Sequence, residues 1–79
     1  MKKEFHYYTD EKGWKIENLE LEELLHLIIE KRIKEINLTG LSEDEIKKIK
    51  EFLKEKNFNF MIKEKYLLDL VKKNFLKID

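Results

Sequence analysis

The first third of the chain has the residue pattern of a β-hairpin followed by a helix. Residues 5–9 are mostly aromatic or β-branched, and in residues 14–17 apolar and charged side chains alternate, so both segments are predicted to be strands. Residues 10–13 are expected to form the turn, with Gly13 at a position that needs a positive φ. One face of the predicted hairpin carries Phe5, Tyr7, Trp14 and Ile16, and the other carries His6, Tyr8, Lys15 and Glu17.

From residue 19 the apolar positions recur at spacings of three and four, which predicts a helix over 19–31 with Asn18 as its N-cap. Residues 35–38 alternate again and precede Gly40, so a short strand and a turn are expected there. Ser42 and Glu45 have the spacing of a capping box, and acidic residues favour the N-terminal end of a helix dipole. A second helix is therefore predicted to begin at this point.

The last third is predicted to form one strand and a third helix. Phe58, Phe60 and Ile62 alternate with polar residues and Met61, which indicates a strand with one buried face. The apolar spacing after that predicts a helix over 64–76. The expected fold is α+β, a two-layer open-faced sandwich in the order ββαβαβα, with a four-stranded sheet in the order 1-2-3-4 and the helices packed on one face. Residues 1–79 are expected to form a single domain.

The composition argues against enzymatic and metal-dependent functions. The chain has no cysteine, which removes disulfides, thiolate nucleophiles and cysteine-ligated metals. Ser42 is the sole serine, and its capping role accounts for it. His26 lies four residues from Glu22 and from Glu30, but a solvent-exposed histidine beside glutamates explains this better than a metal site does. We therefore expect no catalytic residue, no metal and no cofactor.

Charged residues make up 43% of the chain, yet the formal net charge is zero. The lysines of the second predicted helix are interleaved with acidic residues, which cancels much of their field. The polar face of the sheet offers only Tyr8 as a clear aromatic for base stacking. A nucleic-acid-binding regulator that uses the lysines of the second helix or the open sheet face is therefore the alternative, rather than the favoured, function.

Alanine, proline, glutamine and cysteine are absent, while Lys, Glu, Ile, Leu, Phe, Asn and Tyr are abundant. AT-rich codons encode that set, so we expect an AT-rich mesophilic bacterium, or one of its phages or plasmids, as the source. The charged and aromatic start does not have the pattern of a signal peptide, and no apolar run approaches the length of a bilayer span. A cytoplasmic location and no membrane partner are expected.

Two predicted helices carry apolar arcs that are wider than one sheet contact requires. The surplus either packs between the first and third helices or forms an exposed patch for a partner or a second copy, and the sequence leaves both open. We expect a small protein-binding module that inhibits or regulates another protein, in the manner of antitoxins, immunity proteins or anti-CRISPR-type inhibitors. The candidate partner-binding residues are those at the edges of the two arcs: Tyr66, Leu68, Leu27 and Ile29.

Overall fold

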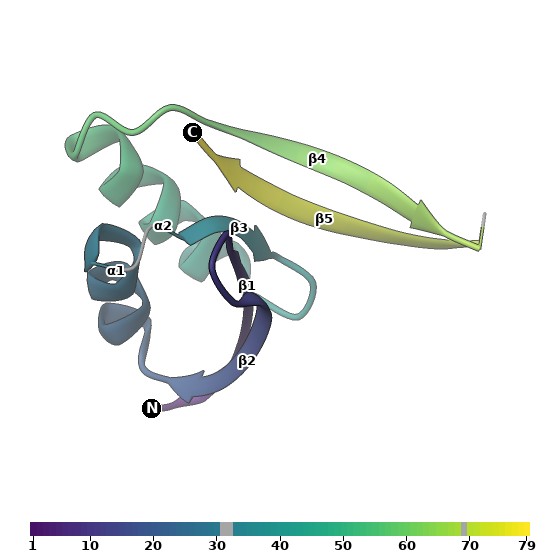
Figure 1. The fold of residues 1–79 in the computed structure, drawn as a ribbon, viewed down its shortest axis with the longest axis horizontal. Coiled ribbons are helices and arrows are strands. Elements are labelled where there is room, and N and C mark those ends of the chain that lie inside the picture. The colour runs from purple at the N-terminus through teal and green to yellow at the C-terminus, as the bar shows by residue number, and fades with distance from the viewer. Residues whose placement is uncertain (31–32, 69) are drawn as a thin grey trace.

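The computed structural model describes residues 1–30, 33–68 and 70–79. Its described elements follow in the order β1 (Lys3–Thr9), β2 (Gly13–Leu19), α1 (Leu21–Glu30), β3 (Ile33–Asn37), α2 (Glu43–Glu55), β4 (Phe60–Leu67) and β5 (Val71–Ile78). The strands form one antiparallel sheet in the order β2-β1-β3-β5-β4 (Figure 1). The predicted α+β class is confirmed, but the described sheet has five strands instead of four.

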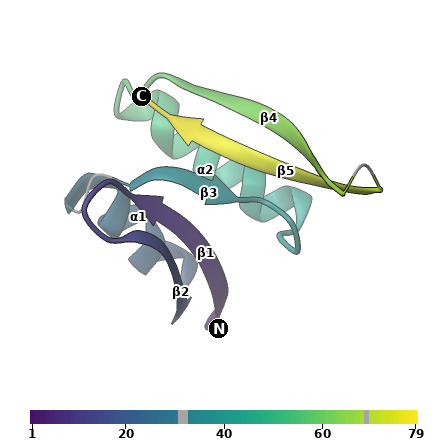
Figure 2. The ribbon, with the colours of Figure 1, turned by 45° about the vertical axis from the view of Figure 1, so that its right-hand side comes forward.

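The predicted strand order 1-2-3-4 is wrong because each helix connects two strands that are not neighbours. The chain leaves β2, runs through α1 and enters β3, while β1 fills the position between these two strands (Figure 2). In the same way α2 leads from β3 to β4, and β5 fills the position between them. Both hairpins thus place one strand inside a crossover, which makes every neighbouring pair antiparallel.

The register of the first hairpin corrects the predicted faces. Thr9 pairs with Gly13, so the turn has three residues, not four, and Tyr7 lies opposite Lys15 rather than Ile16. Because a shift of one residue moves every side chain of a strand to the other face, Trp14 and Ile16 point away from the helices. The positive φ expected at Gly13 is confirmed, at 69°.

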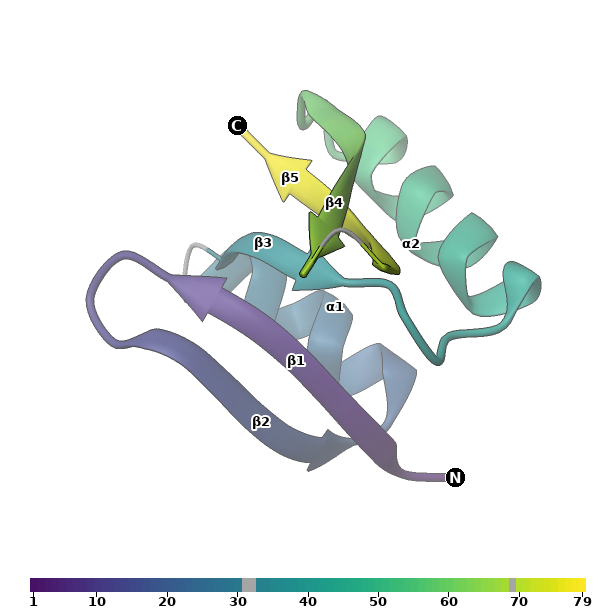
Figure 3. The ribbon, with the colours of Figure 1, turned by 90° about the vertical axis from the view of Figure 1, so that its right-hand side faces the viewer.

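One hydrophobic core lies between the sheet and both helices, so the expectation that the helices share one face is confirmed (Figure 3). Leu24 and Ile28 of α1 and Ile49 and Leu53 of α2 are buried. The strands contribute Phe5, Tyr7, Leu19, Ile33, Ile36, Leu76 and Ile78, and the segment after β3 contributes Leu38. We call the face of the sheet that packs against the helices the helix side, and the opposite face the open side.

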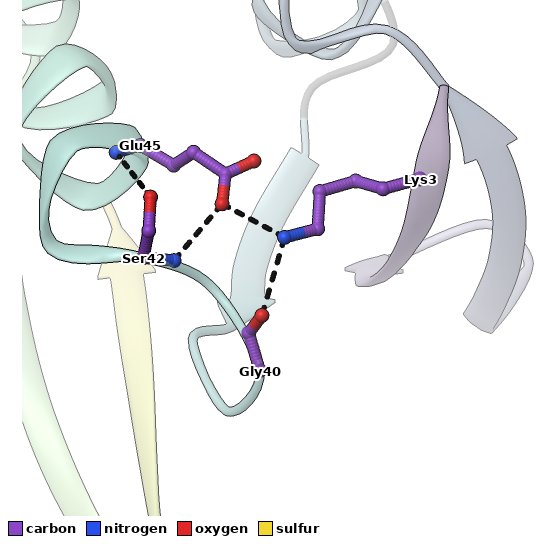
Figure 4. A network of polar contacts seen from close by, with 4 residues as sticks. All are labelled: Lys3, Gly40, Ser42 and Glu45. Atoms are coloured by element: carbon purple, nitrogen blue, oxygen red, sulfur yellow. Dashed lines mark hydrogen bonds and ion pairs between the residues drawn. The ribbon is translucent and has the colours of Figure 1, made fainter. Parts of the chain in front are cut away.

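Helix α2 begins where the sequence predicts. The Ser42 hydroxyl accepts a hydrogen bond from the Glu45 N–H at 3.2 Å, and Glu45 Oε1 accepts one from the Ser42 N–H at 2.9 Å. Lys3 of β1 joins this capping box: its Nζ lies 2.8 Å from Glu45 Oε1 and 3.2 Å from the Gly40 carbonyl oxygen (Figure 4). The start of the chain is thereby tied to the start of α2.

The start of α1 was predicted two residues too early. Leu19 is the last residue of β2 and is buried, so Asn18 is a strand residue and not the N-cap. Glu20 precedes the helix, accepts the hydrogen bond of the Leu24 N–H and donates its own N–H to the Glu23 carboxylate. The predicted end of this helix at Lys31 lies outside the described residues.

The predicted third helix is wrong, because residues 60–67 and 71–78 form the β4–β5 hairpin. Leu76 and Ile78 of β5 are buried in the core, and β5 pairs with the edge of β3 that would otherwise be free. These tertiary contacts stabilise a strand more than the helical spacing of the apolar residues stabilises a helix. The alternating segment is also less buried than expected: Phe58 and Phe60 are half-buried, and Ile62 is exposed.

The position of β5 in the core predicts a large effect of truncating Leu76, which is fully buried. We expect Leu76→Ala to lower the free energy of unfolding by roughly 2–5 kcal/mol, because it removes buried methyl groups and leaves a cavity. Ile16→Ala, on the open side, should change it by less than about 0.5 kcal/mol. Urea unfolding of both variants is the measurement, and equal midpoints would contradict the assigned faces.

The capping network predicts an acid-dependent contribution from Glu45. The Lys3 hydrogen bond, followed by the backbone hydrogen bond at Ser42, lowers the pKa of Glu45 below its ordinary value. A carboxyl group of this kind stabilises the fold above its unfolded pKa, and the contribution is lost as the pH falls through its folded pKa. Glu45→Gln should therefore cost about 1 kcal/mol near neutral pH, and the cost should shrink as the pH falls to about 3. A pH-independent difference in urea midpoint would contradict the charged role.

Candidate functional site

The β4–β5 hairpin extends well beyond the rest of the sheet. Strand β3 pairs with β5 over only three residue pairs, from Glu35 opposite Lys77 to Asn37 opposite Phe75. Strand β4 lies at the edge of the sheet, so residues 64–68 and 70–74 project past β3 as a two-stranded arm (Figure 1). We call residues 64–68 and 70–74 the hairpin arm. An arm of this shape reaches surfaces that a flat sheet edge cannot.

The described residues near the end of the hairpin arm include four large apolar or aromatic side chains that are exposed to solvent. Leu68 is 91% exposed and Leu70 is 89% exposed, and Tyr66 and Val71 are also exposed. Leu68 has a positive φ of 58°, which is rare for a residue other than glycine. Full burial of one such aliphatic side chain is worth roughly 1.5–3 kcal/mol, so the tip carries a large unused capacity for association.

The four predicted partner-binding residues are divided between two places. Tyr66 and Leu68 lie on the hairpin arm, in a strand and a turn rather than on the edge of a helix. Ile29 is exposed on α1, whereas Leu27 is half-buried and packs against the core. The arm and α1 lie at opposite ends of the molecule (Figures 1 and 2). The structure therefore does not join these residues into one patch.

Leu70 and Val71 belong to the arm tip but were not predicted as contact residues. Under the helical interpretation they lay inside the apolar arc, where a helix would pack on the sheet. No apolar alternation marks this part of the strand, because residues 63–65 are all charged.

The open side of the sheet holds a cluster of three aromatic rings: Tyr8, Trp14 and Phe75. The Trp14 ring centroid lies 5.6 Å from that of Tyr8 and 5.7 Å from that of Phe75, with interplanar angles of 62° and 63°. Trp14 comes from the edge strand β2, and its ring reaches over β1 and β3 to contact β5. Phe75 is only 7% exposed, while Trp14 remains 47% exposed.

Lysines surround this cluster on the same side of the sheet. Phe75 pairs with Lys63, and the alternation along β4 and β5 places Lys65, Lys73 and Lys77 on the open side as well. Lys65 Nζ lies 2.9 Å from Glu35 and 4.6 Å from the centre of the Phe75 ring. Among the described residues, the ion pairs include none made by Lys63, Lys73 or Lys77.

A shallow apolar groove runs beside the aromatic cluster. Its lining includes His6, Ile16, Asn37 and Lys65 in addition to Trp14 and Phe75. His6 and Tyr8 lie on the open side as predicted, but Lys15 and Glu17 lie on the helix side. Two of the three rings, Trp14 and Phe75, were not predicted on this side, because Trp14 was expected on the same face as Phe5 and Tyr7 and Phe75 was expected in a helix.

The titratable groups of the described residues make a few isolated pairs. They include no group of three or more histidine, aspartate or glutamate side chains that could hold a metal ion. His6 Nε2 lies 2.9 Å from the Glu4 carboxylate, and His26 is exposed on α1. The buried Tyr7 hydroxyl donates a hydrogen bond to Glu17. This last pair stabilises the fold and keeps the phenol protonated.

No protein family, curated protein or solved structure that was compared with the chain matches it. Within the described ranges, no helix is both long and apolar enough to cross a membrane.

The Tyr7–Glu17 pair predicts a specific loss of stability in alkali. Burial, followed by the hydrogen bond to Glu17, raises the pKa of Tyr7 to about 12. The unfolded chain releases this proton near pH 10, so stability should fall by roughly 1.4 kcal/mol per pH unit between the two values. The difference in unfolding free energy between the unmodified protein and Tyr7→Phe should be constant below about pH 10 and should shrink above it. Parallel curves from neutral pH to pH ~12 would contradict the raised pKa.

Proposed function

We propose that the protein is a small protein-binding module that inhibits or regulates another protein, and that it makes this contact with the tip of the hairpin arm. The observation that carries the proposal is the exposure of Leu68 and Leu70 at the end of a projecting hairpin. Interface energy concentrates in a few large apolar or aromatic side chains that enter pockets of the partner. Tyr66 and Val71, beside the two leucines, supply the rest of such an anchor.

A partner other than a second copy is supported by the side chains of the arm. Lys65 lies directly opposite Lys73 on the open side, and lysines on an edge strand oppose edge-to-edge pairing. A second arm laid alongside would bring further lysines against this pair. The partner should therefore offer an apolar groove with acidic residues at its rim.

The lysines of α2 are a poorer interface centre. The stripe of α2 that carries Ile49 and Leu53 is already buried in the core, and Lys47, Lys48 and Lys54 are exposed charges among acidic neighbours. Desolvating such charges is costly, and lysine is depleted in interfaces.

Substitution of the two leucines tests the proposal. Leu68→Asp combined with Leu70→Asp should weaken binding of the partner by at least ~30-fold, since hot-spot side chains contribute roughly 2 kcal/mol or more each. Ile29→Asp places the same new charge on α1 and is the matched control. Proteins retained by the immobilised chain should be purified, and their affinities should be measured for the unmodified protein and both variants by calorimetry.

Several results would contradict this function. A partner that loses affinity with Ile29→Asp but not with the arm variant would place the interface on α1. If only the combined charge reversal of Lys47, Lys48 and Lys54 abolished binding of the partner, the interface would be an electrostatic one on α2. Sedimentation that shows a dimer of the unmodified protein and a monomer of the arm variant would make the occupant a second copy. Circular dichroism and urea midpoints must show that each variant stays folded.

A further inference from the structure

The open side of the sheet combines two features that a solvated sheet face does not need. The first is an aromatic cluster in which Trp14 is held on two sides by Tyr8 and Phe75 and remains half-exposed. Two edge-to-face contacts restrict the indole ring before any ligand arrives. A restricted, exposed aromatic ring is the platform on which a nucleic-acid base stacks, and each such stack contributes substantially to binding.

The second feature is a group of like charges with few counter-charges. Four lysines of β4 and β5 lie on this side: Lys63, Lys65, Lys73 and Lys77. Lys65 and Lys73 are directly opposite, an arrangement that destabilises a sheet. Glu35 pairs with Lys65 and also lies opposite Lys77, and Glu4 pairs with His6, so counter-charge is least at Lys63, opposite Phe75, and at Lys73, opposite Lys65. An anionic ligand would relieve this repulsion.

We propose that the open side binds single-stranded nucleic acid, with a base stacked on Trp14 and the phosphates lying along Lys63, Lys73 and Lys77. Aromatic platforms beside tracks of lysine have the chemistry of single-strand recognition, because bases are splayed out only when the strand is unpaired. The apolar groove beside Trp14 accommodates the base plane. The side-chain NH₂ of Asn37, which lines the groove, can donate to a base edge, because the Asn37 Oδ1 already accepts a hydrogen bond from the Thr39 N–H.

The charge distribution favours this ligand over a protein on the same surface. Protein interfaces are depleted of lysine at their centres, whereas a polyanion gains affinity from each phosphate that a lysine neutralises. The net charge of the whole chain does not indicate this basic surface, because glutamates of α1, on the helix side, balance the lysines of the open side.

The intrinsic fluorescence of Trp14 gives a direct test, because it is the only tryptophan in the chain. Titration with short oligouridine RNA and oligothymidine DNA should quench this fluorescence, and binding should weaken as salt is added. The two probes show whether RNA or DNA is preferred. A DNA duplex of the same length should bind more weakly than either, since its bases cannot reach the indole.

Charge-neutralised variants separate the proposed site from the rest of the protein. Lys63→Gln, Lys73→Gln and Lys77→Gln together should weaken oligonucleotide binding at least ~10-fold and reduce the logarithmic salt slope by about 2. Lys47→Gln, Lys48→Gln and Lys54→Gln together remove the same charge from α2 and should change both values little. Trp14→Ala should weaken binding by roughly 5-fold or more with the salt slope retained.

Four outcomes would overturn the inference. Neither single strand quenches the Trp14 fluorescence, or the duplex binds as tightly as the single strands. Alternatively, the α2 variant loses as much affinity as the β4–β5 lysine variant, or a polyglutamate peptide binds as tightly as the oligonucleotides. Urea unfolding of Trp14→Ala shows whether the indole only covers Phe75, in which case stability falls and oligonucleotide affinity stays unchanged. The Leu68→Asp, Leu70→Asp variant should bind oligonucleotides normally. The arm proposal and this one can therefore fail independently.

Discussion

The three-residue turn between β1 and β2 is the constraint on which both sides of the sheet depend. It pairs Thr9 with Gly13, and this register sends Phe5 and Tyr7 into the core while it sends Trp14 to the open side. A turn longer by one residue would place Trp14 and Ile16 under the helices and expose Lys15 and Glu17 on the open side. The core and the aromatic cluster therefore arise from the same backbone choice.

Much of the fold could be predicted because its local signals agree with its tertiary contacts. The capping box of Ser42 and Glu45 located the start of α2, and the apolar spacing of α1 identified the core residues Leu24 and Ile28. The one-sided packing also followed from alternation in the strands. These signals are local, so a single sequence contains all of the information that they need.

The hairpin arm could not be predicted in the same way. Leu70, Val71 and Phe75 have a spacing that fits one face of a helix, and Asp69 is the single residue between the strands of a type common in turns, with no glycine, proline or asparagine beside it. Leu68 adopts a positive φ that its residue type disfavours. Residues 71–78 form a strand instead of a helix because Leu76 and Ile78 are buried beside β3. That contact is long-range, so the local residue pattern does not indicate it.

The basic surface on the open side could not be predicted from the local charge of the sequence either. The sequence intermixes lysine and glutamate along β4, so its local net charge is small, but the period of a strand separates the two kinds of residue. Lys63 and Lys65 face the open side, whereas Glu64 faces the helix side and pairs there with Lys72 at 2.7 Å. A chain with no net charge can therefore present a basic surface once its strands form.

The arm and the lysines of the open side belong to one hairpin, and Lys65 lies in both. It lies on the arm, yet its ammonium group contacts Glu35 of β3 and the face of the Phe75 ring. Among the described residues, the Lys65–Glu35 ion pair joins the arm to β3. The Lys72–Glu64 ion pair does not, because both of its residues belong to the arm. An anion near Lys65 would compete with Glu35 for the same ammonium group. The hydrogen bond from the Leu38 N–H to the Asn74 carbonyl oxygen, at 2.9 Å, holds the base of the arm independently of this side chain, so the Lys65 contacts act on the open side rather than on the backbone pairing.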